Sequence, residues 1–580
     1  MDLKCMCRGF KSTSVLVGRL VLAGGLTATL VACGGGGNND TIEQFPTQPV
    51  TIDVLSALVT PSYTLDIGSG PVVFPSSEYD DGNFVLRGAT EPNDIAPLGS
   101  SHDENPAEVR VVQGGYDVLF QHETGDTVPQ NVDSLVQTVA DISVVADPFP
   151  IAVKAWTVTP TFLHNGGAFP VSEYDDGVFY LRPTAGGEDV FLGNSHTVSP
   201  APVLVMQGSY DVIYSLETGG SLVPSNQAAV VMSGEPITSD RPSFVVNVTS
   251  ERFSFNPTHN SGGFPSSQYQ RAEFFLRNAS GDRVELGASF EPPAPPFVIV
   301  GTYDIVYQHV QGDLLPINRD AVLMGDVLID ASNQSQAPDI TSVSITPTFS
   351  LDASPFQESE YQDANFFLRG YINNNDEILL GSSHISTPDA VRIISSADVG
   401  NYDVLYRHES GETVPQNTNA VLQSDIALNV DDALVVLVNS VDVTGAVTLN
   451  GNDFPSDASD SVQFLLRGND LGDVFLFGYS DINNEPVKLV YIPGNYEHYD
   501  VFMDHLAGDA VPQNEMHEVG FGISLNNMTP TLNVNVPAVR VDPSFTLDGQ
   551  SFPASLYQSA TFYLRERHSP KNRIFLGESY

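Results

Sequence analysis

The stretch that decides the fold is Tyr402-Asp403-Val404-Leu405-Tyr406-Arg407. Tyr402, Val404 and Tyr406 alternate with Asp403 and Arg407, and a period of two is typical of a β-strand with one face in a core. Similar short runs surround residues 63–65, 84–86, 109–112 and 136–145, separated by clusters of Gly, Pro, Asn and Asp. No segment after residue 32 has a sustained helical period, so the chain is predicted to be all-β.

The Tyr-Asp pair of this stretch recurs about every 95 residues, which indicates one unit repeated along the chain. It stands at Tyr116, Tyr210, Tyr303, Tyr402 and Tyr499. Four further landmarks accompany it in a fixed order: Phe-Pro, Leu-Arg, Leu-Gly and Pro-x-Asn, found in the first unit at Phe74, Arg87, Gly99 and Pro129. About seven strands in such a length is typical of an antiparallel β-sandwich.

The landmarks divide the chain into a signal peptide, a tether and six units. The predicted ranges are 1–32 for the signal peptide, 33–50 for the tether, 51–147, 148–241, 242–337, 338–432 and 433–530 for the five complete units, and 531–580 for a partial sixth. Six Leu-Arg pairs against five Tyr-Asp pairs mean that the sixth unit stops halfway. Either the chain is truncated there or the half-unit pairs in some other way. Tandem sandwiches of this kind predict a beaded rod.

At the Gly-x-Tyr-Asp-Val strand, for example Gly208–Val212, the sequence resembles prealbumin-like sandwiches, the group that holds carboxypeptidase-regulatory-like and Cna-B-type repeats. The resemblance covers one strand and its turn per unit, and an immunoglobulin-like topology stays open. Cna-B-type repeats often carry a Lys-Asn isopeptide bond. After the leader this chain has only Lys154, Lys488 and Lys571, none at equivalent landmarks, so no such cross-link is expected.

The N-terminus has the pattern of an export signal. Basic residues are followed by an uncharged apolar run over residues 20–32, about 13 residues, whereas a membrane-spanning helix needs roughly 20. The run ends in Leu30-Val31-Ala32-Cys33, which resembles the lipobox of bacterial lipoproteins. The resemblance implies cleavage before Cys33, acylation of its thiol with chains such as palmitate, and a membrane as partner through that anchor. Gly34 after the cysteine favours the outer membrane, facing the periplasm or the cell surface.

Charge and cysteine content exclude several classes of function. The formal net charge is −47, so nucleic acid is excluded as a partner because binding to it requires Lys and Arg at the phosphates. All three cysteines, Cys5, Cys7 and Cys33, lie at or before the predicted cleavage site. The mature chain therefore has no thiol for a disulfide, a nucleophile or a thiolate metal site.

The arginine of the Leu-Arg landmark is kept in all six units, although the chain has only 24 Lys and Arg residues. An acid-base or anion-binding pair with the Asp of Tyr-Asp is one interpretation. Because a site used for chemistry would differ between units rather than recur with the core, a structural ion pair between neighbouring strands is preferred. The predicted pairs are Arg87 with Asp117, Arg182 with Asp211, Arg277 with Asp304, Arg369 with Asp403, and Arg467 with Asp500.

Histidines and serines do not form a recognisable catalytic pattern. Ser101-His102-Asp103 contains the residue types of a hydrolase triad, but adjacent residues on a strand point to opposite faces. The histidine after Tyr-Asp-Val, as at His122, is replaced by Leu216 in the second unit, which favours packing over metal binding. No Gly-x-Ser-x-Gly, His-Glu-x-x-His or phosphate loop is present. The chain is therefore predicted not to be an enzyme.

Two acidic turns are the candidates for a metal site. Calcium binds several oxygens from a tight loop, and the first two units supply them. The candidate ligands are Glu78, Asp80 and Asp81, and Glu173, Asp175 and Asp176. The third unit has Gln268-Tyr269-Gln270-Arg271-Ala272 at this place, so weak Ca²⁺ binding would be local and not a requirement of the fold. No other cofactor is expected.

Repetition without a catalytic constellation favours a lipid-anchored surface spacer or adhesive repeat protein of the cell envelope. The main alternative is a lipoprotein that binds carbohydrate or matrix protein through exposed aromatic residues and acidic loops. The chain has one tryptophan and 21 tyrosines, so tyrosine would have to serve as the aromatic platform. A third alternative is an accessory subunit of an envelope complex.

Overall fold

The computed structural model describes residues 45–139, 141–144, 148–291, 294–371, 373, 375–395, 401–468, 473–481, 486–491, 498–524, 531–566 and 569–579. The predicted signal peptide and Cys33 lie outside these residues. Apart from two 3-10 turns, η1 (Ile142–Val144) and η2 (Leu556–Gln558), the described elements are strands. The predicted all-β class with tandem antiparallel sandwiches is confirmed. Within the described part, no helix has the length and apolarity to cross a membrane.

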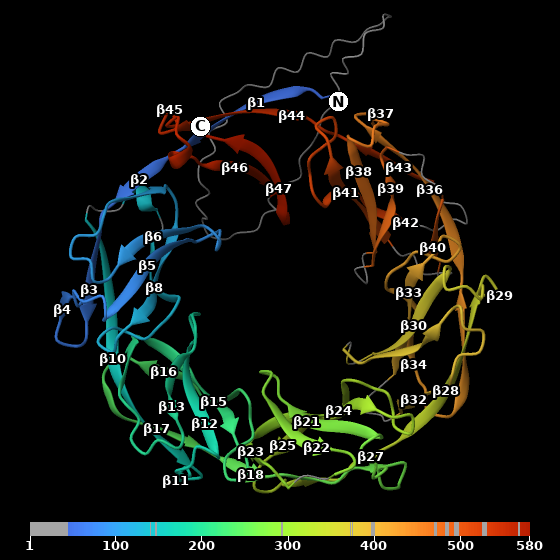
Figure 1. The fold of residues 1–580 in the computed structure, drawn as a ribbon, viewed down its shortest axis with the longest axis horizontal. Helices are drawn as coiled ribbons and strands as arrows, with labels where there is room; N and C mark the ends of the chain where they lie inside the picture. The colour runs from blue at the N-terminus through green and yellow to red at the C-terminus, as the bar shows by residue number, and fades with distance from the viewer. Residues whose placement is uncertain are drawn as a thin grey trace, which may run out of the picture.

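Unit 4 shows how a complete repeat is built (Figure 1). Its first sheet has the order β31 (Glu377–Ser382), β30 (Asp363–Gly370), β33 (Tyr402–Ser410) and β34 (Ala420–Ile426), with antiparallel neighbours. In its second sheet, β28 (Ser342–Leu351) pairs with β29 (Ser354–Pro355), β32 (Val391–Ile394) and β35 (Asp432–Val438). The Leu-Arg strand and the Tyr-Asp strand are therefore the two central strands of the first sheet.

Units 1, 2, 3 and 5 repeat this four-stranded sheet. Its strands, in spatial order, are β6 (Ile95–Ser100), β5 (Asp81–Gly88), β8 (Tyr116–Thr124) and β9 (Ser134–Val139) in unit 1; β13 (Val190–Asn194), β12 (Asp176–Pro183), β15 (Gly208–Thr218) and β16 (Ala229–Ile237) in unit 2; β22 (Arg283–Ala288), β21 (Arg271–Arg277), β24 (Gly301–Gln311) and β25 (Ala321–Ile329) in unit 3; and β39 (Val474–Tyr479), β38 (Ser461–Gly468), β41 (His498–Ala507) and β42 (His517–Ser524) in unit 5.

The opposing strands vary more in length between units. They are β2 (Ser56–Val59), β3 (Pro61–Asp66), β4 (Pro71–Val73) and β7 (Val109–Val112) in unit 1; β10 (Phe149–His164), β11 (Gly167–Ala168), β14 (Val203–Met206) and β17 (Arg241–Val248) in unit 2; β18 (Ser250–Arg252), β19 (Ser254–Phe255), β20 (Thr258–His259), β23 (Phe297–Ile299), β26 (Ser335–Gln336) and β27 (Asp339–Ile340) in unit 3; and β36 (Ser440–Leu449), β37 (Asn452–Asp453), β40 (Val487–Val490) and β43 (Thr531–Val536) in unit 5.

Aromatic rings fill the core between the two sheets. In unit 4, Phe349 of β28 stacks on Phe366 of β30 with ring centroids 3.9 Å apart, and Phe356 of the Phe-Pro landmark meets Phe366 edge-on. Tyr406 of β33 packs on the same ring. Offset stacking and edge-to-face contacts are the favoured geometries of aromatic pairs. The landmarks visible in the sequence are therefore core positions.

Each sandwich closes with a strand that lies after the predicted unit boundary. In unit 4, β35 begins at Asp432 and runs parallel to β28 of the same unit. In unit 1 the closing strand is the first half of β10, where Phe149 pairs with Pro61, and the second half of β10 then opens unit 2. A boundary placed at the turn signals near residue 147 or 432 thus precedes the closing strand, because this strand continues directly into the next unit.

A buried asparagine joins each unit to the next. Asn318, from the Pro-x-Asn motif of unit 3, is fully buried, and its amide donates to the Tyr402 hydroxyl at 3.0 Å and to Asp376 at 2.6 Å in unit 4. Its carbonyl oxygen accepts from the Ile394 backbone amide at 2.8 Å. Asn131, Asn226 and Asn417 also bond to the units that follow them. Each accepts from a strand amide; Asn131 and Asn226 donate to a tyrosine hydroxyl, and Asn226 and Asn417 donate to an aspartate. We call this arrangement the asparagine latch.

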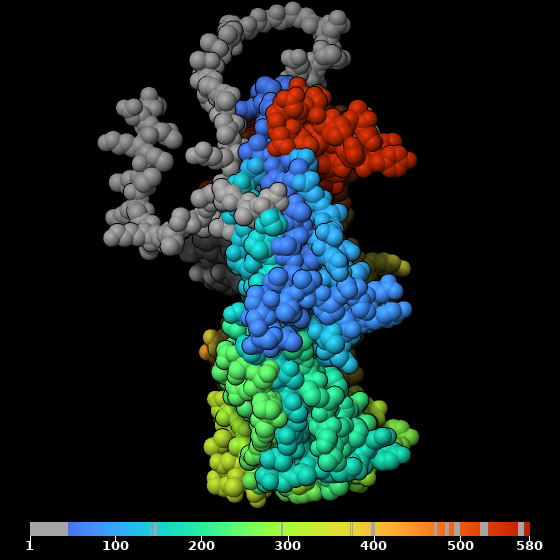
Figure 2. All heavy atoms as spheres, turned by 90° about the vertical axis from the view of Figure 1, so that its left-hand side faces the viewer, coloured from blue at the N-terminus to red at the C-terminus, as the bar shows by residue number. Residues whose placement is uncertain are grey.

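The units form a closed ring, so the expected rod is wrong (Figure 1). The N-terminal strand β1 (Thr47–Val54) runs parallel to β44 (Arg540–Leu547) of unit 6 in continuous register, from Thr47 opposite Arg540 to Val54 opposite Leu547. This is the pairing that β35 makes with β28, so the N-terminus supplies the closing strand of the C-terminal unit. Figure 2 shows β1 and unit 6 packed together at the top of the view.

Unit 6 is completed only in part by this exchange. It contains β44, β45 (Gln550–Ser551), β46 (Thr561–Glu566) and β47 (Ser569–Glu578), and β46 pairs with β47 alone among the described strands. Counterparts of β40, β41 and β42 are not among the described strands of unit 6. The half-unit is thus paired with the N-terminal strand in the structure.

Candidate functional sites

The arginines and aspartates of the predicted pairs face each other in the register of all five complete units. Three units have the ion pair: Arg87 with Asp117 at 3.1 Å, Arg369 with Asp403 at 2.8 Å, and Arg467 with Asp500 at 3.8 Å. The unit 4 pair is the most buried, with 14% and 7% of the two side chains exposed. For Asp403, burial raises the pKa, but hydrogen bonds from Ser424 and Arg369 outweigh it and lower the pKa.

Units 2 and 3 differ from the prediction. Arg182 binds Asp189 at 2.8 Å instead of Asp211, and Arg277 binds Asp320 at 2.9 Å instead of Asp304. In both units the arginine instead binds both carboxylate oxygens of a competing aspartate.

In each unit the aspartate accepts a hydrogen bond from the adjacent edge strand. In four units this strand carries a β-bulge residue with positive φ, and the aspartate binds its backbone amide: Asp211 at Gly234, Asp304 at Asp326, Asp403 at Asp425 and Asp500 at Gly522. In unit 1 the donor is Thr138 Oγ1, which binds Asp117. The recurring aspartates are therefore parts of the sheet.

Three units contain an Asp-His pair that the sequence interpretation missed. Asp81 contacts His102 Nδ1 at 2.8 Å, Asp176 contacts His196 at 2.7 Å, and Asp363 contacts His384 at 3.0 Å. The signal was present in the repeats, because the two positions change together. Where the histidine is replaced by Phe290 or Asp481, the aspartate is replaced by Arg271 or Ser461.

The geometry of the Asp-His pair fits a structural role and not that of a serine hydrolase. Asp81 also accepts hydrogen bonds from Ser100 and Ser101, and Ser100 Oγ lies 2.6 Å from the same His102 Nδ1 that faces the carboxylate. A serine nucleophile needs the other ring nitrogen, Nε2, as its base. Burial raises the pKa of Asp81, but the hydrogen bonds from Ser100, His102 and Ser101 outweigh it and lower the pKa. The hydrogen bond to Asp81 raises the pKa of His102.

The acidic residues predicted to bind calcium point to different partners. Asp81 and Asp176 are buried beside their histidines. Asp80 accepts from the Thr127 amide, and Asp175 accepts from the Ser221 and Leu222 amides. Glu78 and Glu173 lie in the same turns, and within the described residues no group of three or more His, Cys, Asp or Glu side chains converges on a metal position.

The histidines after Tyr-Asp-Val bind backbone. His408 Nε2 lies 2.8 Å from the carbonyl oxygen of Gly411, and His122, His309 and His505 make the same contact with a glycine three residues on. These histidines hold the turn that leads to the Pro-x-Asn motif. Leu216 of unit 2 packs against the core at the equivalent place, so the fold does not depend on the imidazole.

Strongly exposed tyrosines recur at one position of the unit, in what we call the tyrosine turns (residues 77–80, 172–175, 267–270, 359–362 and 555–558). The side chains are 75%, 85%, 71%, 84% and 99% exposed at Tyr79, Tyr174, Tyr269, Tyr361 and Tyr557. In each turn the tyrosine amide donates to the serine hydroxyl two residues before it, at 3.2 to 3.3 Å. Such a turn fixes the backbone, so the rings stand on ordered supports.

A glycine from the next hairpin packs directly beneath four of these turns. Gly125 has φ +89°, and a Cβ there would collide with the carbonyl oxygen of Tyr79. Gly219, Gly312 and Gly411 occupy the same place under the turns of units 2, 3 and 4. In unit 5 the turn is kept, with Gly508 beneath it, but Ser459 replaces the tyrosine. The tyrosine is therefore not needed to form the turn.

Comparison with known proteins gives no family. No family model matches the sequence, and no curated protein matches it. Among solved structures, the chain is similar to the Bacillus anthracis TIE protein (11% identity, 67% of this chain and 74% of that one, TM-score 0.14) and to two B repeat units of the collagen-binding protein of Staphylococcus aureus (11%, 66% and 99%, 0.14). The full-length major pilin RrgB from Streptococcus pneumoniae is a further match (8%, 83% and 99%, 0.13). TM-scores this low carry no argument about function.

Proposed function

We propose that this chain is a non-catalytic adhesive repeat protein of the cell envelope, anchored by lipid at Cys33, which binds its ligand through the tyrosine turns. The observation that carries the proposal is the recurrence of a tyrosine, 71% to 99% exposed, at the same turn of five units. Large exposed aromatics in one constant position cost solubility without adding to the core, and tyrosine is enriched where proteins bind partners.

The spacing of the turns supports a repetitive ligand. One tyrosine turn offers a small contact, and sites on one rigid body reinforce each other when the ligand presents matching groups. A glycan or a matrix polymer has such repeats. The ring also argues against a pure spacer, because a closed ring spans a shorter distance from the membrane than an extended array of the same units.

The geometry of the polar clusters supports a non-catalytic role. The recurring Arg, Asp, His and Asn side chains are engaged in hydrogen bonds that hold bulges, turns and unit junctions. For the envelope location, the support is the lipobox-like segment ending at Cys33, together with the high negative charge, which keeps an exported protein soluble. An outer-membrane position facing the periplasm or the cell surface belongs to the same proposal.

The test is binding of the mature chain to arrays of glycans and matrix proteins, with and without millimolar calcium. We expect saturable binding to one ligand class, weakened at least tenfold when Tyr79, Tyr174, Tyr269, Tyr361 and Tyr557 are all replaced by Ser, the residue of unit 5. The matched control replaces five equally exposed polar residues on other loops. Absence of binding, or binding that the tyrosine replacements leave unchanged, would refute the role of the tyrosine turns. Loss of acyl labelling in Cys33→Ala tests the anchor.

A further inference from the structure

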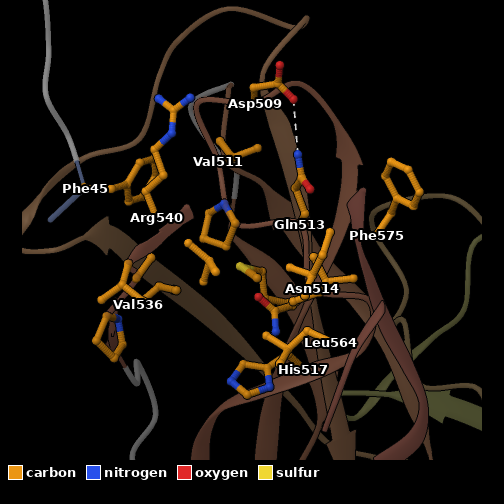
Figure 3. Close-up of a pocket in the computed structure, with 18 of the residues that line it drawn as sticks. Phe45, Asp509, Val511, Gln513, Asn514, His517, Val536, Arg540, Leu564 and Phe575 are labelled. Carbon is orange, nitrogen blue, oxygen red and sulfur yellow. Dashed lines mark hydrogen bonds between the residues drawn. The ribbon is translucent and has the colours of Figure 1, made fainter. Parts of the chain in front are cut away.

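Unit 3 contains a pocket at a place where other units have an aromatic ring. The pocket has a volume of about 380 Å³, and its lining is mainly apolar, with the side chains of Phe255, Phe264, Phe274, Leu286 and Phe290. We call it the unit 3 pocket. It lies within one complete unit, whereas the pocket of about 500 Å³ in Figure 3 is lined by two units, 5 and 6. The other units therefore show what fits the unit 3 pocket.

In units 1, 2, 4 and 6 an aromatic ring of the opposing strand lies flat on the phenylalanine of the Leu-Arg strand. The planes of the two rings are within 9° of parallel in every case. The pairs are Tyr63 with Phe84, Phe162 with Phe179, Phe349 with Phe366, and Phe545 with Phe562, with ring centroids 4.3, 4.0, 3.9 and 3.9 Å apart. A stacked ring is thus a regular part of the unit.

Unit 3 has Pro257 at the position of this ring. His164 and His259 occupy the same place in the parallel pairing with the closing strand, and each stacks on the phenylalanine of its Phe-Pro landmark. Phe162 and Pro257 each stand two residues before that histidine. Because proline has no aromatic ring, the stack of the other units cannot form in unit 3.

The space of the missing ring is not refilled in unit 3. Phe255 meets Phe274 with the ring planes tilted by 59°, so Phe274 has no parallel ring on it among the described residues. Unit 5 also lacks the ring and has Val447 at the position, but the larger Phe477 replaces the leucine of its Leu-Gly landmark and is only 4% exposed. Unit 3 keeps that leucine as Leu286, so the pocket stays open.

Unit 1 shows which polar group an aromatic ring at this place can reach. The Tyr63 hydroxyl donates to the carbonyl oxygen of Leu98 at 2.9 Å. Leu98 has no partner in the register of β5 and β6, because it lies at a β-bulge. Leu286 lies at the same bulge between β21 and β22 of unit 3. A hydroxyl on a ring in the unit 3 pocket would therefore have the Leu286 carbonyl oxygen as its acceptor.

Two further substitutions in unit 3 lie beside the pocket. Phe290, which lines it, stands where three other units have the histidine of the Asp-His pair, and Arg271 stands in place of the aspartate. The Arg271 guanidinium lies 5.9 Å from the centroid of the Phe290 ring and is paired with Glu273. A polar pair of the other units is thus exchanged for an aromatic wall, and an apolar pocket of this kind takes up an aromatic ligand.

We infer that the unit 3 pocket binds a small phenolic compound. The aromatic ring of the ligand lies flat on Phe274, as Tyr63 lies on Phe84, and its hydroxyl donates to the Leu286 carbonyl oxygen. A volume of about 380 Å³ is near the lower end for small-molecule sites and suits a single ring with a short substituent. This inference goes beyond the proposed adhesive function, since it uses neither the tyrosine turns nor their ligand.

The test is isothermal titration of the mature chain, residues 34–580, with p-cresol and with toluene. These two molecules are the side chains of tyrosine and phenylalanine without the backbone, so they reproduce the rings of units 1 and 2. We expect p-cresol to saturate one site per chain with a dissociation constant in the millimolar range or tighter. Toluene should bind roughly threefold to tenfold more weakly, the effect of one lost hydrogen bond.

Variants that fill the pocket test its location. Pro257→Phe supplies the ring of units 2 and 4, and Leu286→Phe supplies the larger side chain of unit 5, so each should weaken p-cresol binding at least tenfold. Pro257→Ala is the matched control, because it leaves the ring absent and should change the affinity less than about twofold. No saturable binding of p-cresol, unchanged binding in both filled variants, equal losses in Pro257→Ala and Pro257→Phe, or equal affinity for toluene would overturn the inference.

Discussion

The asparagine latch makes a prediction that one chain can test against itself, by comparing Asn318→Ala with Asn514→Ala. Both residues belong to Pro-x-Asn motifs, but Asn318 is fully buried with three partners in the next unit, and the Asn514 side chain has none among the described residues. Asn318→Ala removes bonds to the Tyr402 hydroxyl and the Ile394 amide and one to the Asp376 carboxylate. Two neutral bonds and one charged bond amount to about 4 kcal/mol of stability at that junction.

The assay is hydrogen-deuterium exchange, because repeat arrays open locally and a single global unfolding energy would average the effect over all units. The Ile394 amide should exchange on the order of a thousandfold faster in Asn318→Ala, the factor that corresponds to about 4 kcal/mol. Asn514→Ala should change no segment by more than about 0.5 kcal/mol. Equal effects of the two substitutions, or unchanged exchange at Ile394, would refute the interpretation of the motif as a junction.

Three further predictions concern the pairing of β1 with β44, the Asp81–His102 pair and the arginine–aspartate pairs. Thr51 and Ser544 lie opposite each other in the β1–β44 register, so the double variant Thr51→Cys, Ser544→Cys should form a disulfide within one mature chain. On a non-reducing gel the monomer should then migrate faster than the reduced protein. A ladder of multimers would show that β1 of one copy pairs with β44 of another. Asp81→Asn should lower the pKa of His102 toward 6.5, as measured by NMR titration, and an unchanged pKa would contradict the pairing. The Asp81–His102 pair stabilises unit 1 below that pH, and the stabilisation is lost as the pH rises through the raised pKa of His102. Arg369→Met should destabilise unit 4 by about 2 kcal/mol in denaturant unfolding, because the ion pair that it removes is buried. Arg182→Met removes a more exposed ion pair and should change stability by less than about 0.5 kcal/mol. Equal losses of stability would contradict burial as the source of the difference.

The sequence predicted the elements that depend on local alternation. Tyr402, Val404 and Tyr406 share one face of β33, and the Leu-Arg and Tyr-Asp strands pair in every complete unit as their constant spacing implied. The Asp-His pairs could have been predicted as well, since Asp81 and His102 change together with their counterparts across the repeats. Because the six units align with one another, this covariation is visible in the sequence itself.

Ring closure could not be predicted from such patterns. The closing strand β1 is a short stretch, Thr47–Val54, whose partner lies almost five hundred residues away in β44. Nothing in the alternation of β1 distinguishes pairing with its own neighbours from pairing with the far end. The deciding quantity is the angle between consecutive units, which is set by contacts between side chains of different units.

The contacts between side chains of consecutive units explain why the repeats form a closed ring. The amide of Asn131, Asn226, Asn318 or Asn417 is buried and bonded to the next unit through both its oxygen and its nitrogen, so each of these junctions permits little rotation. Similar junctions turn the chain in the same sense at every step, and a repeated rotation that closes gives a ring. The asparagine of the Pro-x-Asn motif is therefore what fixes one unit against the next in the described ring.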